Sequence, residues 1–160
     1  MMGAAAFTDM DRSWMERAVA LAEVAEQEGE VPVGALVVKD GIVLGEGWNR
    51  TISLSDPAAH AEIMALREAG ASTNNYRLPG CTLYVTLEPC CMCAGAMIHA
   101  RLQRVVFGAA DPKTGAAGGV FKLLSDPRHN QVPEVQGGCL AEQCSEQLKR
   151  FFRRRREEQA

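Results

Sequence analysis

A buried strand that runs directly into a cysteine-bearing helix limits how this chain can fold. Residues Thr82–Leu87 form a short apolar run, and Pro89 follows where a helix can begin, because a first-turn residue needs no N–H. The helix is expected to run to about His99. Cys90 and Cys93 are three residues apart, so their sulfur atoms face the same side of one helical turn. The segment therefore predicts a strand-to-helix junction that presents two thiols.

Strand and helix patterns alternate along the rest of the chain. Asp40-Gly41 is a strong hairpin signal between two apolar runs, and Thr8 is suited to cap a first helix. We expect helices over residues 9–27, 60–69, 89–99 and 140–156, and strands over 35–39, 42–45, 82–87, 104–108 and 132–136. The loops are expected over 48–59 and, rich in glycine, over 109–119. This alternation predicts an α/β sandwich with helices on both faces of a sheet.

The composition is that of one globular domain. Apolar residues make up 47 % and charged residues 23 % of the 160 residues, which argues against disordered, collagen-like and fibrous classes. No apolar run approaches the ~18 residues that a membrane span needs, and the start of the chain lacks the pattern of a signal peptide. We therefore expect a single domain over residues 1–160 in the cytoplasm, with residues 1–8 disordered and no membrane partner.

The cysteines indicate a metal site. In a reducing compartment, clustered cysteines are more typical of metal binding or catalysis than of disulfides. His60 with Cys90 and Cys93 would give zinc three protein ligands and leave the fourth position open, which is the arrangement of catalytic sites. Cys91 points about 100° away from Cys90 on a helix, so we interpret it as buried packing. Cys81, Cys139 and Cys144 are likewise interpreted as small buried side chains.

Glu62 completes the motif His-x-Glu followed by Pro-Cys-x-x-Cys, which is the signature of zinc deaminases. His60 and Cys90 each begin a predicted helix, so two positive helix ends converge on the metal and favour thiolate ligands. Glu62 is placed to move a proton without binding the metal. Taken singly, Cys-x-x-Cys is also typical of a redox pair, a histidine at a helix start is more often structural, and a lone glutamate is usually a solvated charge.

The charge is concentrated at the C-terminal end. Residues 149–160 hold 6 of the 17 basic and 2 of the 20 acidic residues, although the net charge is −3. The segment Phe151-Phe152-Arg153 places aromatic side chains beside cations, which suits stacking on bases and contact with phosphates. This pattern indicates a local contact with a polyanion. The alternatives without a functional role are that Phe151 and Phe152 pack the C-terminal helix on the core and that Arg153–Arg156 is the solvated end of that helix.

Several longer motifs extend the zinc signature. They are Val31–Gly34, Gly45–Arg50, His60–Leu66, Thr82–Cys93, Ala94–His99, Lys113–Gly118 and Phe151–Arg153. On these motifs the chain resembles, over about residues 10–156, the bacterial tRNA-specific adenosine deaminases of the cytidine-deaminase-like superfamily. The zinc signature is common to that superfamily, whereas the Gly-Trp-Asn, Ala-Gly-Ala-Met-Ile-His and Lys-Thr-Gly-Ala-Ala-Gly runs are typical of the tRNA branch.

The resemblance implies a three-layer α/β/α cytidine-deaminase-like fold with a five-stranded mixed sheet and helices on both faces. It also implies one Zn²⁺ per subunit, a homodimer, and deamination of the wobble adenosine of a tRNA anticodon stem-loop to inosine. Asn49 would hydrogen-bond the target nucleoside, and a wall would hold the flipped base. That wall would consist of the backbone at Ala61 and the side chains of Val33, Leu87 and Pro89.

Further RNA contacts are expected from Asp111, Lys113, Phe151, Phe152 and Arg153. We expect the Asp111 carboxylate to accept a hydrogen bond from a 2′-hydroxyl, the donor that DNA lacks. Asn49 beside Trp48 is also typical of a turn, as is Asp111-Pro112. Two other functions compete: a free nucleoside, nucleotide or guanine deaminase of the same fold, and a non-catalytic zinc-stabilised RNA-binding module. The basic helix argues against the first and Glu62 against the second.

Overall fold

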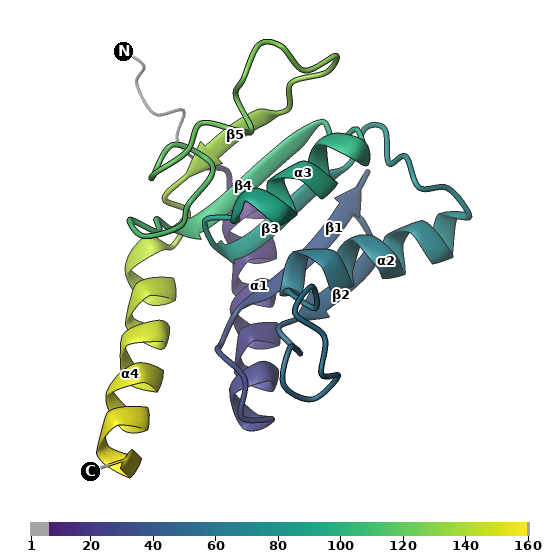
Figure 1. The fold of residues 1–160 in the computed structure, drawn as a ribbon. Helices are drawn as coiled ribbons and strands as arrows, with labels where there is room; N and C mark the ends of the chain where they lie inside the picture. The colour runs from purple at the N-terminus through teal and green to yellow at the C-terminus, as the bar shows by residue number, and fades with distance from the viewer. Residues whose placement is uncertain (1–6, 160) are drawn as a thin grey trace.

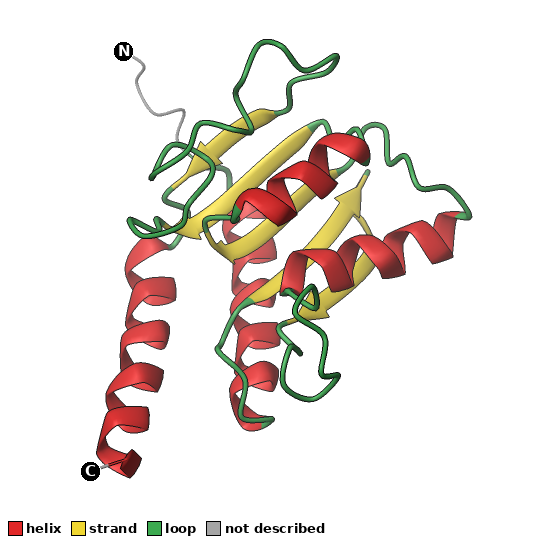
Figure 2. Cartoon of the chain, viewed as in Figure 1, coloured by secondary structure: helices red, strands yellow, loops and turns green. Residues whose placement is uncertain are grey.

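The computed structural model describes residues 7–159, which form a five-stranded mixed sheet between two layers of helices (Figure 1, Figure 2). The helices are α1 (Asp9–Gln27), α2 (Ala61–Thr73), α3 (Cys91–His99) and α4 (Ala141–Gln159). The strands are β1 (Gly34–Lys39), β2 (Ile42–Trp48), β3 (Thr82–Leu87), β4 (Arg104–Ala109) and β5 (Glu134–Gly137). The predicted three-layer α/β fold is confirmed.

The sheet is ordered β2-β1-β3-β4-β5. β1 runs antiparallel to both β2 and β3, whereas β3, β4 and β5 are parallel. The β1–β3 register pairs Ala35 with Val85, so the beginning of β1 lies beside the end of β3. The pairing of Gly34 with Trp48 brings the end of β2 to the same edge. One edge of the sheet therefore collects the ends of β2, β3 and β4 and the start of β1.

Both faces of the sheet are covered, which is why its strands read as continuous apolar runs. Because side chains alternate between the two faces, each strand contributes to two cores. α2 and α3 cover one face, where Val37, Val85 and Val105 are fully buried. α1 and α4 cover the other, where Leu36, Tyr84 and Val106 are buried. The metal-ligand helices therefore share one layer.

The N-terminal helix begins with the predicted cap. Thr8 and Asp11 form a capping box, in which the Asp11 backbone N–H donates to Thr8 Oγ1 at 3.0 Å and the Thr8 N–H donates to Asp11 Oδ2 at 3.1 Å. Phe7 packs against the core on this face. Phe7 and Thr8 thus make defined contacts, in contrast with the expected disorder, while residues 1–6 lie outside the described residues.

The structure extends two elements beyond their predicted ends. β2 continues through Gly45 and Gly47 to Trp48, and α2 continues past Gly70 to Thr73. A Cβ on Gly45 would lie 2.4 Å from the Ala65 carbonyl oxygen, so the glycines let β2 approach α2 closely rather than ending the strand. α2 ends instead at Asn74, which adopts the left-handed conformation with φ of 54°.

α4 reaches beyond the sheet and lies along α1 (Figure 1). Gln147 donates to the Val19 carbonyl oxygen at 3.2 Å, Arg154 pairs with Glu26, and Arg155 donates to the Gly29 carbonyl oxygen at 3.1 Å. These contacts fix the direction of the basic end. None of the helices within residues 7–159 combines the length and apolar sequence that crossing a membrane requires.

Candidate metal centre and active site

The three predicted metal ligands converge at the edge where β3 ends. His60 Nδ1 lies 3.6 Å from Cys90 Sγ and 3.5 Å from Cys93 Sγ, and the three donor atoms all lie within 4.8 Å of one another. His60 is the N-cap of α2 and Cys90 is the N-cap of α3, yet neither side chain forms a capping hydrogen bond. Both side chains are therefore free to turn toward a common point.

This donor set fits zinc. One imidazole nitrogen and two sulfurs are ligands that Zn²⁺ prefers, and three of them leave a tetrahedral position for a reactant. The pKa of the Cys90 thiol is lowered to about 4, because it accepts a hydrogen bond from Cys93 and lies beside His60. A low thiol pKa favours the thiolate that binds metal. His60, Cys90 and Cys93 thus form a site for one zinc ion per chain.

Cys91 does not follow its prediction. We expected it to be buried, but its side chain is exposed at the first position of α3, whereas Cys93 and Ala94 are buried. Cys81, Cys139 and Cys144 are buried as expected. Within the described residues, Cys91 belongs to no group of side chains arranged to hold a metal. The two thiols of the site are therefore Cys90 and Cys93.

Glu62 lies in the first turn of α2, two residues after His60, and is 4 % exposed. Its burial beside the metal ligands raises its pKa to about 7. A carboxyl group with this pKa can both take and give a proton near neutral pH, which is what general acid–base catalysis requires. The arrangement places a carboxyl group that can exchange a proton beside the predicted zinc ligands.

The residues predicted to form the base wall belong to the layer that holds the metal ligands. Val33 and Ala61 belong to the buried core on this face, and Leu87 and Cys90 pack against it. Pro89 is also buried. The backbone N–H of Asn49 donates to the Val33 carbonyl oxygen at 3.1 Å, whereas its side chain forms no hydrogen bond with any residue in 7–159. A polar side chain without a protein partner is therefore held at the edge of an apolar wall.

Asp111 is held in a tight turn. Its carboxylate accepts from the backbone N–H groups of Lys113 at 2.9 Å and Thr114 at 3.2 Å, and from the Thr114 hydroxyl at 2.9 Å. Partial burial opposes ionisation, but these hydrogen bonds outweigh it and hold the pKa of Asp111 below its usual value. Asp111 therefore closes a turn, as the alternative interpretation of Asp111-Pro112 predicted. The contact of its carboxylate with a 2′-hydroxyl stays a prediction.

Two buried glutamates organise the loops around the site and were not predicted. Glu30 accepts from the backbone N–H groups of Ile52 at 3.1 Å and Ser53 at 2.7 Å. Glu88 accepts from three backbone N–H groups of the glycine-rich loop. The sequence does carry a signal for both: each glutamate lies next to apolar residues and a proline, where a solvated charge is not expected.

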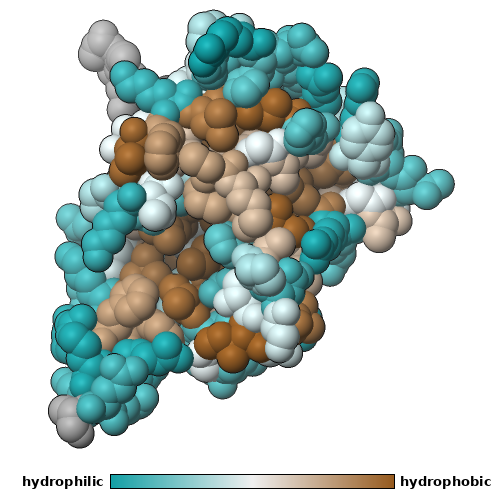
Figure 3. All heavy atoms as spheres, viewed as in Figure 1, coloured by the Kyte–Doolittle hydropathy of each residue, from teal (hydrophilic) through white to brown (hydrophobic). Residues whose placement is uncertain are grey.

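The basic end of α4 forms one side of a groove of about 700 Å³. Cationic side chains from two segments, together with Phe152, line it: Lys113, Lys149, Arg153, Arg155 and Arg156. Figure 3 shows hydrophilic residues gathered over this end of α4. Phe152 is 44 % exposed, but Phe151 is 5 % exposed and lies under the Arg155 guanidinium. Phe151 therefore packs α4 on the core, as the structural alternative predicted, and Phe152 is the aromatic side chain available for stacking.

Comparison with known proteins agrees with this site. Residues 8–109 match the family model of the cytidine and deoxycytidylate deaminase zinc-binding region. A tRNA-specific adenosine deaminase of Haemophilus influenzae is 53 % identical over 152 residues, which cover 94 % of this chain and 88 % of that protein.

Solved structures give the same picture. One, from work on A-to-I editing by tRNA:A34 deaminases at the wobble position, is 43 % identical with a TM-score of 0.82, and the match covers 85 % of this chain and 99 % of that one. A guanine deaminase from Nitrosomonas europaea has a TM-score of 0.78 at 24 % identity, covering 88 % of this chain and 83 % of that one, a likeness that concerns the fold alone.

Proposed function

Because the chain belongs to the cytidine and deoxycytidylate deaminase family and aligns over most of its length with tRNA-specific adenosine deaminases, we propose that it converts the wobble adenosine of a tRNA anticodon to inosine. The reaction adds water to the adenine ring and releases ammonia, so it is a hydrolytic deamination. The observation that carries the proposal is the buried Glu62 beside three convergent zinc ligands, on a chain that also has a basic groove.

The site residues divide the chemistry among them. His60, Cys90 and Cys93 would hold the zinc ion, which when bound would act as a Lewis acid that lowers the pKa of a water molecule. Glu62 takes one proton from the attacking water and delivers it to a ring nitrogen of the base, and it then passes the second proton to the amino group, which leaves as ammonia. The raised pKa of Glu62 suits all of these transfers, because neither protonation state is strongly favoured near pH ~7.

The base enters the site from a single-stranded loop. Anticodon-loop bases are already exposed, so extruding one of them costs little. Val33, Leu87 and Pro89 form the apolar wall, and the Asn49 side chain bonds the nucleoside with groups that no residue of the described chain occupies. Lys113, Phe152 and Arg153 bind the surrounding nucleotides through the basic groove, and Asp111 accepts from a ribose 2′-hydroxyl.

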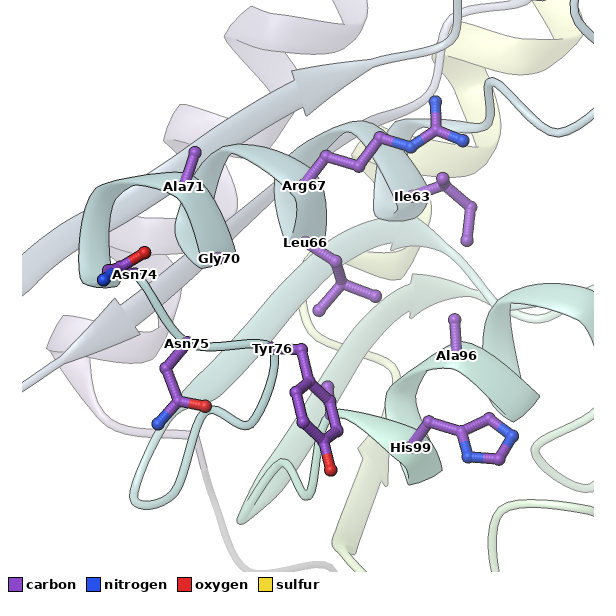
Figure 4. Close-up of a pocket in the computed structure, with 11 residues that line it drawn as sticks. Ile63, Leu66, Arg67, Gly70, Ala71, Asn74, Asn75, Tyr76, Ala96 and His99 are labelled. Atoms are coloured by element: carbon purple, nitrogen blue, oxygen red, sulfur yellow. The ribbon is translucent and has the colours of Figure 1, made fainter.

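The chain acts as a homodimer, which we infer from an apolar groove between α2 and α3. The groove measures about 730 Å³, and Figure 4 shows Leu66, Tyr76, Ala96 and His99 around its hollow. Tyr76 is 70 % exposed. A second copy seated here would pack on α2 and α3, the two helices that begin at the metal ligands. Sedimentation of the wild type and of a Leu66→Glu variant tests this: a dimeric wild type with a monomeric variant supports it, a monomeric wild type contradicts the homodimer, and a variant that stays dimeric contradicts this interface.

The two competing functions each leave one feature of the structure without a role. A deaminase of free nucleosides or guanine has no use for a groove lined by five cationic side chains. A non-catalytic RNA-binding module does not need a carboxyl group buried beside an open metal position. An enzyme that edits tRNA works where tRNA is found, so the cytoplasm is the proposed compartment.

One assay separates these functions. The zinc-loaded protein is incubated with an anticodon stem-loop whose wobble base is adenosine and, in parallel, with adenosine, cytidine and guanine. Inosine in the stem-loop, with ammonia released and little turnover of the free compounds, supports the proposal. Preferred turnover of a free compound supports the small-molecule deaminase, and binding of the stem-loop without any turnover supports the binding module.

A further inference from the structure

Glu88 lies between the metal site and the glycine-rich loop 110–119. It follows β3 directly, precedes Pro89 and Cys90, and is 3 % exposed. Its Oε1 accepts from the Asp111 N–H at 2.9 Å, and its Oε2 accepts from the N–H groups of Ala117 at 2.9 Å and Gly119 at 2.8 Å. One carboxylate thus holds both ends of the loop.

The loop is fitted closely around this carboxylate. A Cβ on Gly115 would lie 2.3 Å from Glu88 Cδ and 2.4 Å from its Oε2, so no larger residue fits there without a shift. A Cβ on Gly119 would lie 2.6 Å from the Asp111 carbonyl oxygen and 2.7 Å from Glu88 Oε1. Glycine at these two positions therefore serves the approach of the loop backbone to Glu88.

The contacts continue from Glu88 to the basic groove. Glu88 accepts from Asp111, and the Asp111 carboxylate accepts from the Lys113 and Thr114 N–H groups. The side chain of Lys113 lines the groove opposite the basic end of α4. We propose, resting on the function proposed above, that Glu88 is a positioning residue for RNA: it fixes the loop that brings Lys113 to the phosphates of the anticodon loop.

Only an acceptor can fill this role. A carboxylate accepts and does not donate, so both oxygens suit the three N–H groups that face them. In Glu88→Gln, an amide NH₂ replaces one oxygen and leaves at least one buried backbone N–H without a partner. The zinc ligands are less affected, because their positions depend on β3 and on the starts of α2 and α3.

The test is a double-mutant cycle in RNA binding. Affinity of the zinc-loaded protein for the anticodon stem-loop is measured against salt concentration for the wild type, Glu88→Gln, Lys113→Ala and the double variant. Loss of one phosphate contact lowers the salt slope by about 1. We expect Lys113→Ala to lose about that much in the wild type and close to nothing in the Glu88→Gln background. KM for the stem-loop should rise in Glu88→Gln while zinc content stays unchanged.

Two further variants keep the test decisive. Glu30→Gln is the matched control, since it removes an acceptor from the other buried glutamate, and Lys113→Ala should keep its full effect in that background. Gly115→Ala disturbs the same contact from the loop side and replaces Glu88→Gln if that variant does not fold. Independent, additive effects of Glu88 and Lys113 would overturn the inference. Absence of inosine with the wild type would instead contradict the proposed function.

Discussion

His60 and Cys90 occupy the N-cap positions of α2 and α3, where a side chain usually accepts a hydrogen bond from the first turn. Neither side chain does so, and the loss of a capping bond typically costs about 1 kcal/mol. With His60 and Cys90 as metal ligands, α2 and α3 therefore lack the stabilisation that a side-chain cap would give. The N-terminal ends of both helices lie at the ligand positions, where the helix dipoles favour thiolate and developing negative charge.

Glu62→Gln separates proton transfer from metal binding. Glutamine has nearly the same size and leaves His60, Cys90 and Cys93 in place, so zinc content and fold should be retained. Because general acid–base groups contribute about 10²–10⁴-fold, we expect the deamination rate to fall toward the upper end of that range. Single-turnover rates on the stem-loop, together with metal analysis, check this. A zinc-loaded variant with nearly wild-type turnover would reject Glu62 as the proton carrier.

The adjacent thiols provide a matched pair for the ligand assignment. Cys90→Ala removes a ligand and is expected to lose both zinc and activity, whereas Cys91→Ala changes an exposed side chain and is expected to retain both. Metal content per chain, measured after dialysis against a weak chelator, distinguishes the variants. The assignment fails if Cys91→Ala empties the site while Cys90→Ala stays loaded.

At the scale of elements, α1 is fixed to the sheet by Asp11. Its carboxylate accepts from the Arg104 guanidinium at 2.7 and 3.0 Å and from the Tyr84 hydroxyl at 2.8 Å. The hydrogen bonds from Arg104, opposed in part by burial, hold the pKa of Asp11 well below its ordinary value of 3.8. This network joins α1, β3 and β4 on the face away from the zinc site.

Asp11→Asn should therefore lower stability without lowering activity. Removing one partner of a buried ion pair leaves Arg104 without its charge partner and is expected to cost about 3 kcal/mol. Since folding depresses the pKa of Asp11, this contribution is present above pH ~4 and is lost as the pH falls further. Urea unfolding at pH ~7 and pH ~3 checks this prediction. A difference between wild type and variant that persists undiminished in acid would contradict it.

Helices and strands whose signals are local in the sequence were predicted correctly, whereas strand ends that depend on packing were not. The helix at Asp9–Gln27 with its Thr8 cap and the strand at Thr82–Leu87 were predicted correctly, because their signals are local. The second strand was predicted to end at Gly45, although β2 continues through Gly45 and Gly47 against α2 to Trp48. A glycine that permits close packing and a glycine that ends a strand look alike in sequence, because the difference depends on a distant element.

At the scale of the whole molecule, the metal ligands could be predicted, but the hydrogen bonds that hold the loops around them could not. His60, Glu62, Cys90 and Cys93 follow a fixed spacing whose chemistry is specific. Glu30 and Glu88 act through backbone groups more than 20 residues away, and no periodicity marks such partners. Phe151 and Phe152 are adjacent and chemically alike, so only the packing of α4 reveals which one is buried.

The basic groove gives a prediction for the whole molecule. Arg154 pairs with Glu26 of α1, and Arg155 both lines the groove and donates to the Gly29 carbonyl oxygen, whereas Arg153 and Arg156 line the groove and, within residues 7–159, form no hydrogen bond or ion pair with α1. Replacing Arg153 and Arg156 together with alanine should weaken stem-loop binding and lower its salt slope by up to about 2, with little change in zinc content. Arg128→Ala, which removes an exposed cation paired with Asp126, is the control. Equal slopes in the wild type and the double variant would show that these arginines do not bind phosphates.

The most direct measurement follows the oxygen atom of the product. An anticodon stem-loop with adenosine at the wobble position is incubated with the protein in water enriched in heavy oxygen, and the nucleosides are analysed by mass spectrometry. The account predicts inosine that carries the heavy oxygen, formed by zinc-loaded protein and lost when zinc is removed. Inosine formed equally well without zinc, or no inosine from the zinc-loaded protein, would contradict it.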